Sequence, residues 1–515
     1  MSMPVFVLFS RSLALDGRKF LTYLARMLLV LIIIFSLLSA QATSGAMGAP
    51  GLSFFHGAVW TTWLFISLAG VVLFSSVISE EKEEMTLGLL KMTGLNPVSI
   101  LLGKSASRVL GGIFLLLAQF PFTLLAITLG GVSLGQVIAA YCMLLSYLVF
   151  LGGLALFCSV SCRRTASAAG LTLLLLLVFF LLPWLGQMML DGAASVGWIS
   201  PTGGFHVACT TLFQWMRDAS PITRIETIMQ TGFAESPIGF QVLSNLGVGV
   251  FFFLVSWLTF ERFTREQKTA APARILLFRR TSLFAPVGVG RAWSRPLIWK
   301  EFHFDTGGKV MLGVKAALLA VTFAVIAHFI WPARISRPDV EQLGTVMMVV
   351  SLVLAVVELI FHAGRTFNKE HKWQTLSSLM LLPITPQRLV YHKLAGCLLA
   401  LTPYLAFFCV GAILSPQDFL TGLKGILGSP AGWMGILQVV LILHLAAYMS
   451  LVVRYGGVAL ALLIAYVGNT LTFPLFFFSF GNVTVFLIMQ SLVLLFFTVL
   501  LHVQIMRRLV RKAGE

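Results

Sequence analysis

The chain carries few charged residues for its length. Asp, Glu, Lys and Arg make up 11% of its 515 residues, whereas 58% are hydrophobic and the mean hydropathy is +0.94. A soluble domain carries about 25% charged residues, because its surface faces water. The composition therefore excludes an ordinary soluble protein and predicts a polytopic membrane protein of the all-α class.

Patterns that mark an enzyme or a metal site are also missing. The six cysteines match neither a disulfide framework nor zinc-ligand spacing. Gly103-Lys104-Ser105 resembles the end of a phosphate-binding loop, but Val98 stands where that motif needs its first glycine. The hydrolase patterns H-E-x-x-H and G-x-S-x-G do not occur. We expect no catalytic residue, metal or cofactor in this chain, so ATP hydrolysis would require another polypeptide.

Long apolar runs are abundant. A membrane-spanning helix needs about 20 mostly apolar residues, and this rule predicts twelve spans in the chain. They lie near residues 20–42, 57–79, 105–130, 134–160, 168–190, 239–261, 310–331, 344–366, 391–415, 431–453, 457–479 and 482–506.

The excess of basic residues predicts an orientation. Lys and Arg number 36 against 19 Asp and Glu, which gives a net charge of +17. With the amino terminus in the cytoplasm, most of them fall in inward loops, as is typical of membrane proteins. The outward loops then hold Arg217, Arg224, Arg334, Arg337 and Lys424. We predict both termini on the cytoplasmic side of the inner (cytoplasmic) membrane, with membrane lipid and not nucleic acid as the partner of the basic loops.

The sequence contains signs of an internal duplication. A shift of 289 residues aligns Glu81 with Glu370 and Lys104 with Lys393. The same shift aligns further residues of the same type or charge, namely Arg11 with Lys300, Arg26 with Lys315, Thr86 with Thr375, Leu87 with Leu376 and Pro97 with Pro386. We therefore predict two parallel six-helix halves. Residues 1–265 form the first half, 266–289 a basic cytoplasmic linker and 290–515 the second half.

The inner loops 80–104 and 369–393 occupy corresponding positions in the two halves. In the first loop, Met85, Leu89 and Met92 recur at helical spacing, and the acidic run before them suits a helix N-terminus. Gly94 then ends the predicted helix. Such a helix either lies on the bilayer surface or inserts into a groove of a soluble partner. Its recurrence in both halves favours docking.

These loops resemble those of the type-two ABC exporter permeases. The resemblance rests on a Glu after the second span, a Thr-Leu pair, a Pro about ten residues later and a Lys at the start of the third span. The stretch Pro296-Leu297-Ile298-Trp299-Lys300-Glu301 is similar to the amphipathic helix that precedes the first span in that family. The family usually has Gly before Thr-Leu, where this chain has Met85 and Gln374.

The resemblance implies a permease subunit of an ATP-driven ABC transporter, of the exporter type. Two separate ATP-binding-cassette subunits, which bind ATP and Mg, would dock on coupling helices in loops 80–104 and 369–393. The candidate docking residues are Glu81, Glu84, Thr86, Leu87, Lys91, Pro97, Glu370, Thr375, Leu376 and Pro386.

The two loops differ in charge. The first has four acidic residues between Glu80 and Glu84, whereas the second has Lys369, Glu370, His371 and Lys372. One interpretation is that the two ATPase contacts are inequivalent. The alternative is that these charges are simply solvated.

Ionisable residues inside spans are candidates for the translocation path. Glu358 and His362 are spaced i, i+4 in the eighth predicted span, and His444 lies near the middle of the tenth. An ion-coupled secondary transporter with twelve spans is the alternative function, and Glu358 is its strongest coupling candidate. A structural hydrogen-bond network is the other interpretation of these residues.

Overall fold

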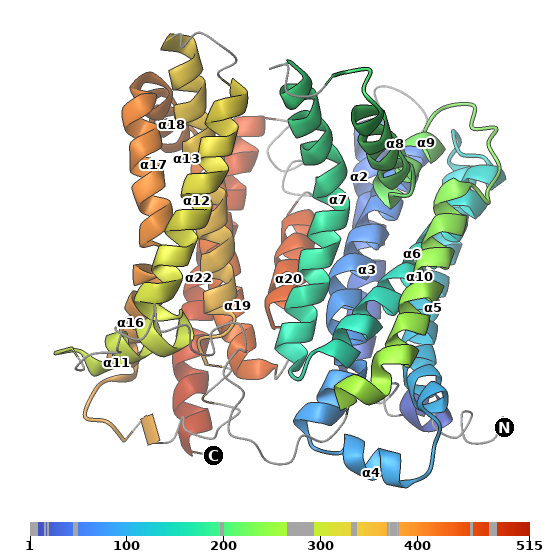
Figure 1. Ribbon diagram of the computed structural model, residues 1–515, viewed down its shortest axis with the longest axis horizontal. Helices are drawn as coiled ribbons and strands as arrows, with labels where there is room; N and C mark the ends of the chain where they lie inside the picture. The colour runs from blue at the N-terminus through green and yellow to red at the C-terminus, as the bar shows by residue number, and fades with distance from the viewer. Residues whose placement is uncertain are drawn as a thin grey trace. The chain divides into compact units, whose positions relative to one another are not determined.

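Every regular secondary-structure element in the described part of the protein is a helix. The computed structural model describes residues 9–14, 17, 20–44, 50–195, 200–264, 293–330, 337–367, 370, 378–379, 381–453, 457–472 and 482–514. No strand occurs among these residues, and Figure 1 shows long helices with short connections. The predicted all-α class is therefore confirmed for this part. The predicted linker 266–289 lies outside it.

The chain divides into two compact units. The first unit comprises Met1–Ala194, Ile199–Gln267 and Tyr466–Pro474, and the second comprises Ser195–Trp198, Lys268–Ala465 and Leu475–Glu515. The predicted boundaries of the two halves stay a prediction, and the two units are described separately below.

The first unit is built around one buried helix. Its helices are α2 (Phe20–Ser44), α3 (Pro50–Glu83), α4 (Leu87–Met92), α5 (Pro97–Thr128), α6 (Leu134–Ser161), α7 (Thr165–Ser195), α8 (Gly204–Asp218), α9 (Pro221–Ile228) and α10 (Phe240–Thr264). Helix α6 packs on α3, α5 and α10. A Cβ atom on Gly153 of α6 would lie 2.2 Å from the carbonyl oxygen of Gly249 in α10. Small residues at this crossing let the two backbones touch, as is common between membrane helices.

The second unit contains a similar set of long helices. They are α11 (Pro296–Lys300), the π-helix η2 (Glu301–Asp305), α12 (Gly308–Ile330), α13 (Arg337–Ala363), α16 (Pro386–Leu399), α17 (Thr402–Leu414), α18 (Pro416–Gly428), α19 (Pro430–Val452), α20 (Gly457–Leu471) and α22 (Val483–Gly514). Helix α20 is divided, because its residues from Tyr466 on belong to the first unit. Helix α13 packs on α17 and α19, and α19 packs on α22. Gly344 and Gly411 allow α13 and α17 to approach closely, since a Cβ on Gly411 would lie 2.6 Å from the Gly344 carbonyl oxygen.

The helices account for most of the predicted spans. Eight helices in the described part are long and apolar enough to cross a membrane, and the number is ten if each of two bent pairs counts as one span. Predicted spans 20–42 and 457–479 coincide with shorter apolar helices, Arg26–Leu38 and Leu460–Thr470. The chain is thus a multi-pass membrane protein by length and composition of its helices, and the total of twelve spans stays a prediction.

Two bent helix pairs lie at predicted spans, the first just before span 310–331 and the second within span 391–415. The first bend, of 52°, joins Pro296–Asp305 to Gly308–Ala324 through Gly307, whose φ is +82°. The second bend, of 57°, divides the predicted span 391–415 into α16 and α17. Pro403, near the start of α17, has no backbone N–H to continue the α16 helix.

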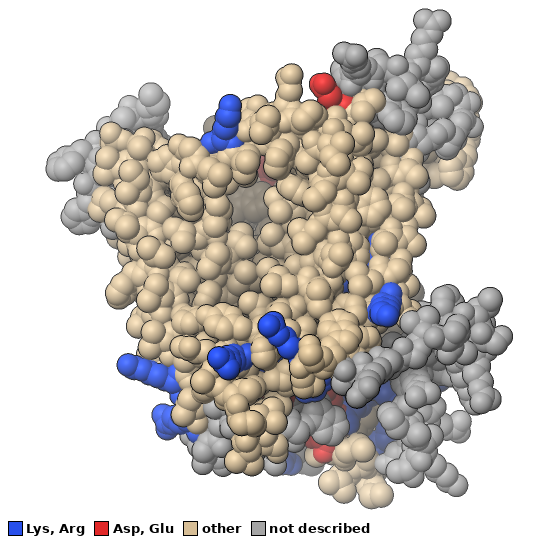
Figure 2. Space-filling view, turned by 90° about the vertical axis from the view of Figure 1, so that its left-hand side faces the viewer, with Lys and Arg blue, Asp and Glu red and all other residues tan. Residues whose placement is uncertain are grey.

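The surface of the second unit is largely uncharged. Figure 2 shows a face on which uncharged residues form a broad band, while most of the Lys and Arg residues in view lie toward one edge. Leu318, Leu405, Ile413, Leu492 and Phe496 are among the exposed apolar side chains of this unit. Such a continuous apolar surface is unusual for a soluble monomer and fits contact with lipid.

Candidate functional site

The first predicted docking loop begins at an ionic cluster. Glu81, in the last turn of α3, forms a salt bridge with Lys104 of α5 and accepts a hydrogen bond from the Thr86 hydroxyl. Arg11 also acts on the Glu81 carboxylate through its charge. The cluster is partly open to water, since the side chains of Lys104 and Glu81 are 19% and 25% exposed. It therefore fixes the end of α3 against the start of α5 while leaving the pair accessible.

The turn after α3 has the geometry of a glycine-type helix end. The Thr86 N–H donates to the Glu81 carbonyl at 3.0 Å, and Met85 between them has a φ of +59°. This is the hydrogen-bond pattern of a Schellman motif, in which a left-handed residue, usually Gly, follows the helix. The exporter permeases that this loop resembles usually have Gly at the position of Met85. Met85 adopts the left-handed conformation that a Gly would take.

The predicted coupling helix is shorter than expected and starts later. The acidic run at Glu80–Glu83 continues α3 to its C-terminal end, so the prediction that it opens a new helix was wrong. Helix α4 comprises six residues, Leu87–Met92. The reason is the left-handed Met85, which interrupts the helix between the acidic run and α4.

One face of α4 packs against the rest of the first unit, and the opposite face is exposed. Leu87 is buried in an apolar cluster with Ile78 and Phe260, and the Lys91 ammonium donates to the Thr264 hydroxyl at 2.6 Å and to its carbonyl at 3.0 Å. The opposite side carries Leu89 and Met92 of the predicted stripe, whereas Met85 lies in the turn before α4. Met85, Leu89 and Met92 are exposed by 84%, 66% and 84%.

The other residues considered in this loop either stabilise the neighbouring helices or are exposed. Pro97 is the first residue of α5, where its missing N–H costs nothing. Glu83 accepts a hydrogen bond from the Thr165 hydroxyl at 2.9 Å, which ties α3 to the start of α7. Glu84 is exposed next to Met85. The accessible part of the loop is therefore Glu84 together with the methionine and leucine stripe.

The second loop contains a corresponding ionic cluster that is buried. The Lys393 ammonium of α16 lies 2.7 Å from Glu370 and 2.6 Å from Glu301 of η2. These three side chains are exposed by 1%, 3% and 2%. Lys300, at the end of α11, lies 3.5 Å from the same Glu370 oxygen. Lys393 therefore joins three segments: η2, the segment after α13, and α16.

Close packing brings this second cluster together. A Cβ on Gly396 of α16 would lie 2.6 Å from the Glu301 side chain and 2.9 Å from the Ile298 carbonyl oxygen. Only a glycine lets η2 and α11 lie this close to α16. Pro386 is the first residue of α16, and the Thr385 hydroxyl caps that helix. Thr375, Leu376, Lys369 and Lys372 lie outside the described residues.

The two clusters follow the sequence shift of 289 residues. Glu81 and Lys104 pair in the first unit, and Glu370 and Lys393, which the shift aligns with them, pair in the second. The shift aligned these residues, but neither their contacts nor the part of Glu301 was predicted from the sequence. The available signal was a Glu and a Lys 23 residues apart at matching positions in both loops.

The path candidates form two separate groups. Glu358 of α13 pairs with Lys315 of α12 and lies 3.0 Å from His362 on its own helix. Lys315 also lies 3.4 Å from the Ala400 carbonyl at the α16–α17 bend and over the ring of Tyr404. This arrangement favours the interpretation as a structural network, and Lys315 is the member that the sequence analysis did not connect to it.

His444 belongs to a different contact. Its Nδ1 atom lies 2.8 Å from the Val440 carbonyl oxygen one turn earlier in α19, and its ring is 5.7 Å from that of His502 in α22. The side chain is thus held within the α19–α22 packing. In the described part of the chain, no group of three or more His, Cys, Asp or Glu side chains is arranged to hold a metal ion.

No protein-family model matches the chain, and no curated protein matches it. Its function is therefore inferred from the residues and contacts described above.

Proposed function

We propose that the chain is the membrane-spanning permease subunit of an ATP-driven ABC transporter of the exporter type. In this proposal it is a fused duplication of two six-helix halves in the inner (cytoplasmic) membrane, with both termini inside. Two ATP-binding-cassette subunits, which carry ATP and Mg, dock on loops 80–104 and 369–393.

One observation carries the proposal. A short helix, α4, exposes Leu89 and Met92 at the end of a span, with Met85 exposed in the turn before it, and the Glu81–Lys104 salt bridge and the Lys91–Thr264 hydrogen bonds hold this loop in place. An apolar stripe on an anchored helix fits insertion into a groove of a soluble partner. The recurrence of the Glu–Lys pair at Glu370 and Lys393 supports a second contact of the same kind.

The proposed mechanism needs a rigid connection between the docking helix and the spans. Glu81 lies in α3, Lys104 in α5 and Thr264 at the end of α10, so force applied to α4 reaches three long helices at once. In the second loop, Lys393 transmits force to η2 and α16 in the same way. ATP-driven closure of the two ATPase subunits would thus change the packing of both sets of spans.

The test is purification of the chain from its native host, followed by identification of co-purified proteins. We expect an ATP-binding-cassette subunit in the wild-type sample. The double variant L89E/M92E places two charges on the exposed stripe and is expected to reduce its recovery at least tenfold. Val510→Glu, which adds a charge at an exposed position near the end of α22, serves as the matched control.

The same experiment tests whether the two loops contact the ATPase subunits differently. Reversing the charges of Glu83 and Glu84 is expected to reduce ATPase recovery more than reversing Lys369 and Lys372. Equal effects would contradict inequivalent contacts. Absence of any ATPase from the wild-type sample, together with transport driven by an ion gradient, would overturn the whole proposal.

The alternative function is an ion-coupled secondary transporter. The observation that favours it is the ionic group of Lys315, Glu358 and His362, with Glu358 and His362 in a candidate span. Glu358→Gln separates the two functions. It would abolish transport in a transporter coupled through Glu358, whereas an ATP-driven permease is expected to keep its ATPase-dependent transport.

A further inference from the structure

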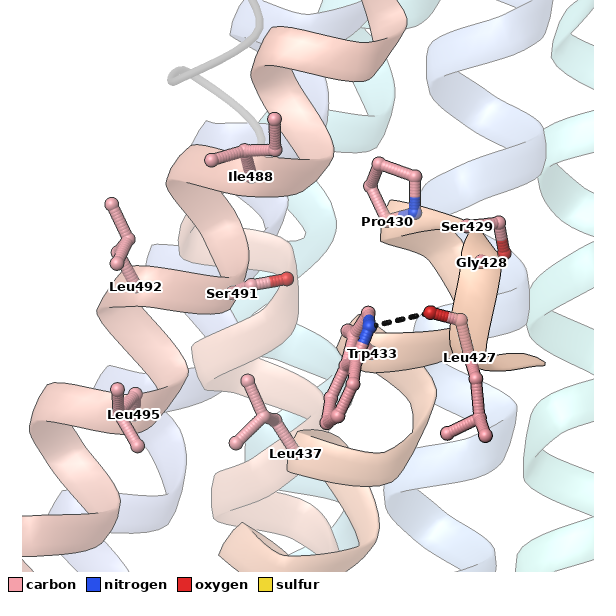
Figure 3. A pocket seen from close by; sticks show the side chains of 10 residues that line it. All are labelled: Leu427, Gly428, Ser429, Pro430, Trp433, Leu437, Ile488, Ser491, Leu492 and Leu495. Carbon is pink, nitrogen blue, oxygen red and sulfur yellow. Dashed lines mark hydrogen bonds between the residues drawn. The ribbon is translucent and has the colours of Figure 1, made fainter.

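A small apolar pocket lies between the α18–α19 turn and α22. Its volume is about 320 Å³, and Figure 3 shows Ser491 of α22 pointing toward Trp433 of α19. Seven of its lining side chains are apolar, namely Leu427, Pro430, Trp433, Leu437, Ile488, Leu492 and Leu495. Helices α19 and α22 are both long and apolar enough to span the membrane.

The polar atoms around this pocket are already bonded within the protein. The Trp433 indole N–H donates to the Leu427 carbonyl at 2.9 Å, as Figure 3 shows. The Ser429 hydroxyl donates to the Gly425 carbonyl at 2.5 Å, and the Ser491 hydroxyl donates to the Leu487 carbonyl at 2.7 Å. A ligand inside the pocket therefore gains little from polar groups, and an apolar chain suits it best.

The basic residue nearest to the pocket along α18 is Lys424. It is three residues before the lining residue Leu427, so both lie on one face of that helix about 4.5 Å apart along its axis. At the start of α19, Pro430 has no N–H and the Gly432 N–H donates to the Ser429 hydroxyl, so this helix end offers an anion little. The carbonyls of Gly425 and Leu427 near the end of α18 accept the bonds described above, which reduces their effect on an anion.

The single acidic residue of α18 is held at its other end. Asp418 accepts hydrogen bonds from the hydroxyls of Thr345, at 2.5 Å, and Ser415, at 2.8 Å. These bonds lower the pKa of Asp418 below its ordinary value, so it stays ionised. Along α18 the negative charge thus lies at the start and the positive charge of Lys424 lies toward the pocket.

We propose that this pocket holds an acyl chain of an anionic membrane phospholipid whose phosphate lies at Lys424. The apolar lining supplies affinity for the chain, and the basic side supplies the preference for an anionic headgroup. Trp433 belongs to a residue type that is enriched where membrane helices meet the headgroups. This binding does not depend on how transport is driven.

Native mass spectrometry of the full chain in detergent is the direct test. Phosphatidylglycerol and phosphatidylcholine with identical acyl chains are added separately, and the fraction of protein that retains a lipid is measured. We expect wild type to retain phosphatidylglycerol about fivefold better than phosphatidylcholine, as one Lys near a membrane surface would give. Equal retention of the two lipids would overturn the anionic site.

Two variants separate the chain site from the headgroup site. Ser491→Phe fills the pocket and is expected to reduce retention of both lipids at least tenfold. Lys424→Gln is expected to remove the preference for phosphatidylglycerol while phosphatidylcholine retention stays the same. Arg217→Gln changes a basic residue on α8 in the first unit and is the control, with the wild-type result expected.

A second measurement keeps the proposal testable if Ser491→Phe fails to fold. Brominated phosphatidylglycerol quenches tryptophan fluorescence at close range, and the chain contains 11 Trp residues. The difference in quenched fluorescence between wild type and Trp433→Phe gives the contribution of Trp433, which lines the pocket. We expect this component to be saturable in wild type. Its absence, or a dimer of the chain that covers the pocket and excludes lipid, would overturn the proposal.

Discussion

The first unit leaves its Glu81–Lys104 pair partly exposed, whereas the second unit buries Glu370 and Lys393 together with Glu301. The shift of 289 residues places Ser12 where the second unit has Glu301. One added carboxylate, supplied by η2, thus accompanies the change from an accessible pair to a buried triad. Two loops that carry the same pair of charges thus differ in how far that pair is buried.

The membrane-spanning regions of the two units also differ in the charge of the side chains that join their helices. In the first unit, polar side chains join α3 to its neighbours through neutral groups, with Thr62 bonded to Gln119 and Ser67 to Tyr147 at 2.7 Å. In the second unit the corresponding helix carries Glu358, paired with Lys315. A buried ionic pair is costly to break, whereas a neutral hydrogen bond between membrane helices contributes only about 0.6 kcal/mol on average.

The largest expected effect comes from breaking the buried triad. Lys393→Met leaves the carboxylates of Glu301 and Glu370 without their shared ammonium, and we expect it to lower the free energy of unfolding by about 3–5 kcal/mol. The matched variant Lys104→Met removes the partner of a partly exposed pair, with an expected loss of about 1 kcal/mol or less. Unfolding of the purified full chain in detergent measures both. Similar losses would show that the two clusters contribute equally to the free energy of unfolding, despite their different burial.

A smaller effect is expected from the ionic pair inside the spans. Lys315→Met leaves Glu358 with its bonds to His362 and Tyr404 alone, and we expect a loss of about 2–3 kcal/mol because the pair is slightly exposed. The double variant K315M/E358Q is expected to recover most of this loss, since it removes both charges. Gln119→Leu in the first unit is the neutral counterpart, with about 1 kcal/mol expected. A double variant as unstable as the single one would contradict an ionic origin.

The smallest effect concerns the turn that positions α4. Met85→Gly relieves a left-handed non-glycine residue and is expected to stabilise the first unit by about 1 kcal/mol. Gly94→Ala is the control of opposite sign, because Gly94 has a φ of +73° with open space around it and Ala there costs about 1 kcal/mol. Both shifts are read from the unfolding midpoint. A destabilised M85G protein would mean that the Met85 side chain makes a contact that outweighs its backbone conformation.

The helical class and the positions of the long helices were accessible from sequence, because apolar runs of about 20 residues have few other uses. Leu89 and Met92 lie on one exposed face of α4 as predicted from helical spacing, whereas Met85 is exposed in the turn before that helix. The start of α4 was not predicted, because the same acidic run that suits a helix N-terminus also continues α3 until the left-handed Met85 interrupts it.

Contacts between segments far apart in the chain could not be predicted from the sequence. Glu301 and Lys393 are 92 residues apart and meet because Gly396 admits η2 against α16, which no periodicity reveals. Lys315 and Glu358 lie on different helices, and their pairing depends on how α12, α13 and the α16–α17 bend pack. The alignment at a shift of 289 residues identified the residue types but carried no information on distance.

Helix α3 is longer than a membrane is thick. Its 34 residues rise about 51 Å, against a hydrocarbon thickness of about 30 Å. If it tilts as a rigid rod by about 5°, its Glu81 end moves by about 4 Å. In the second unit α13 ends at Ala363, seven residues before Glu370, so α13 does not itself carry the second ionic cluster.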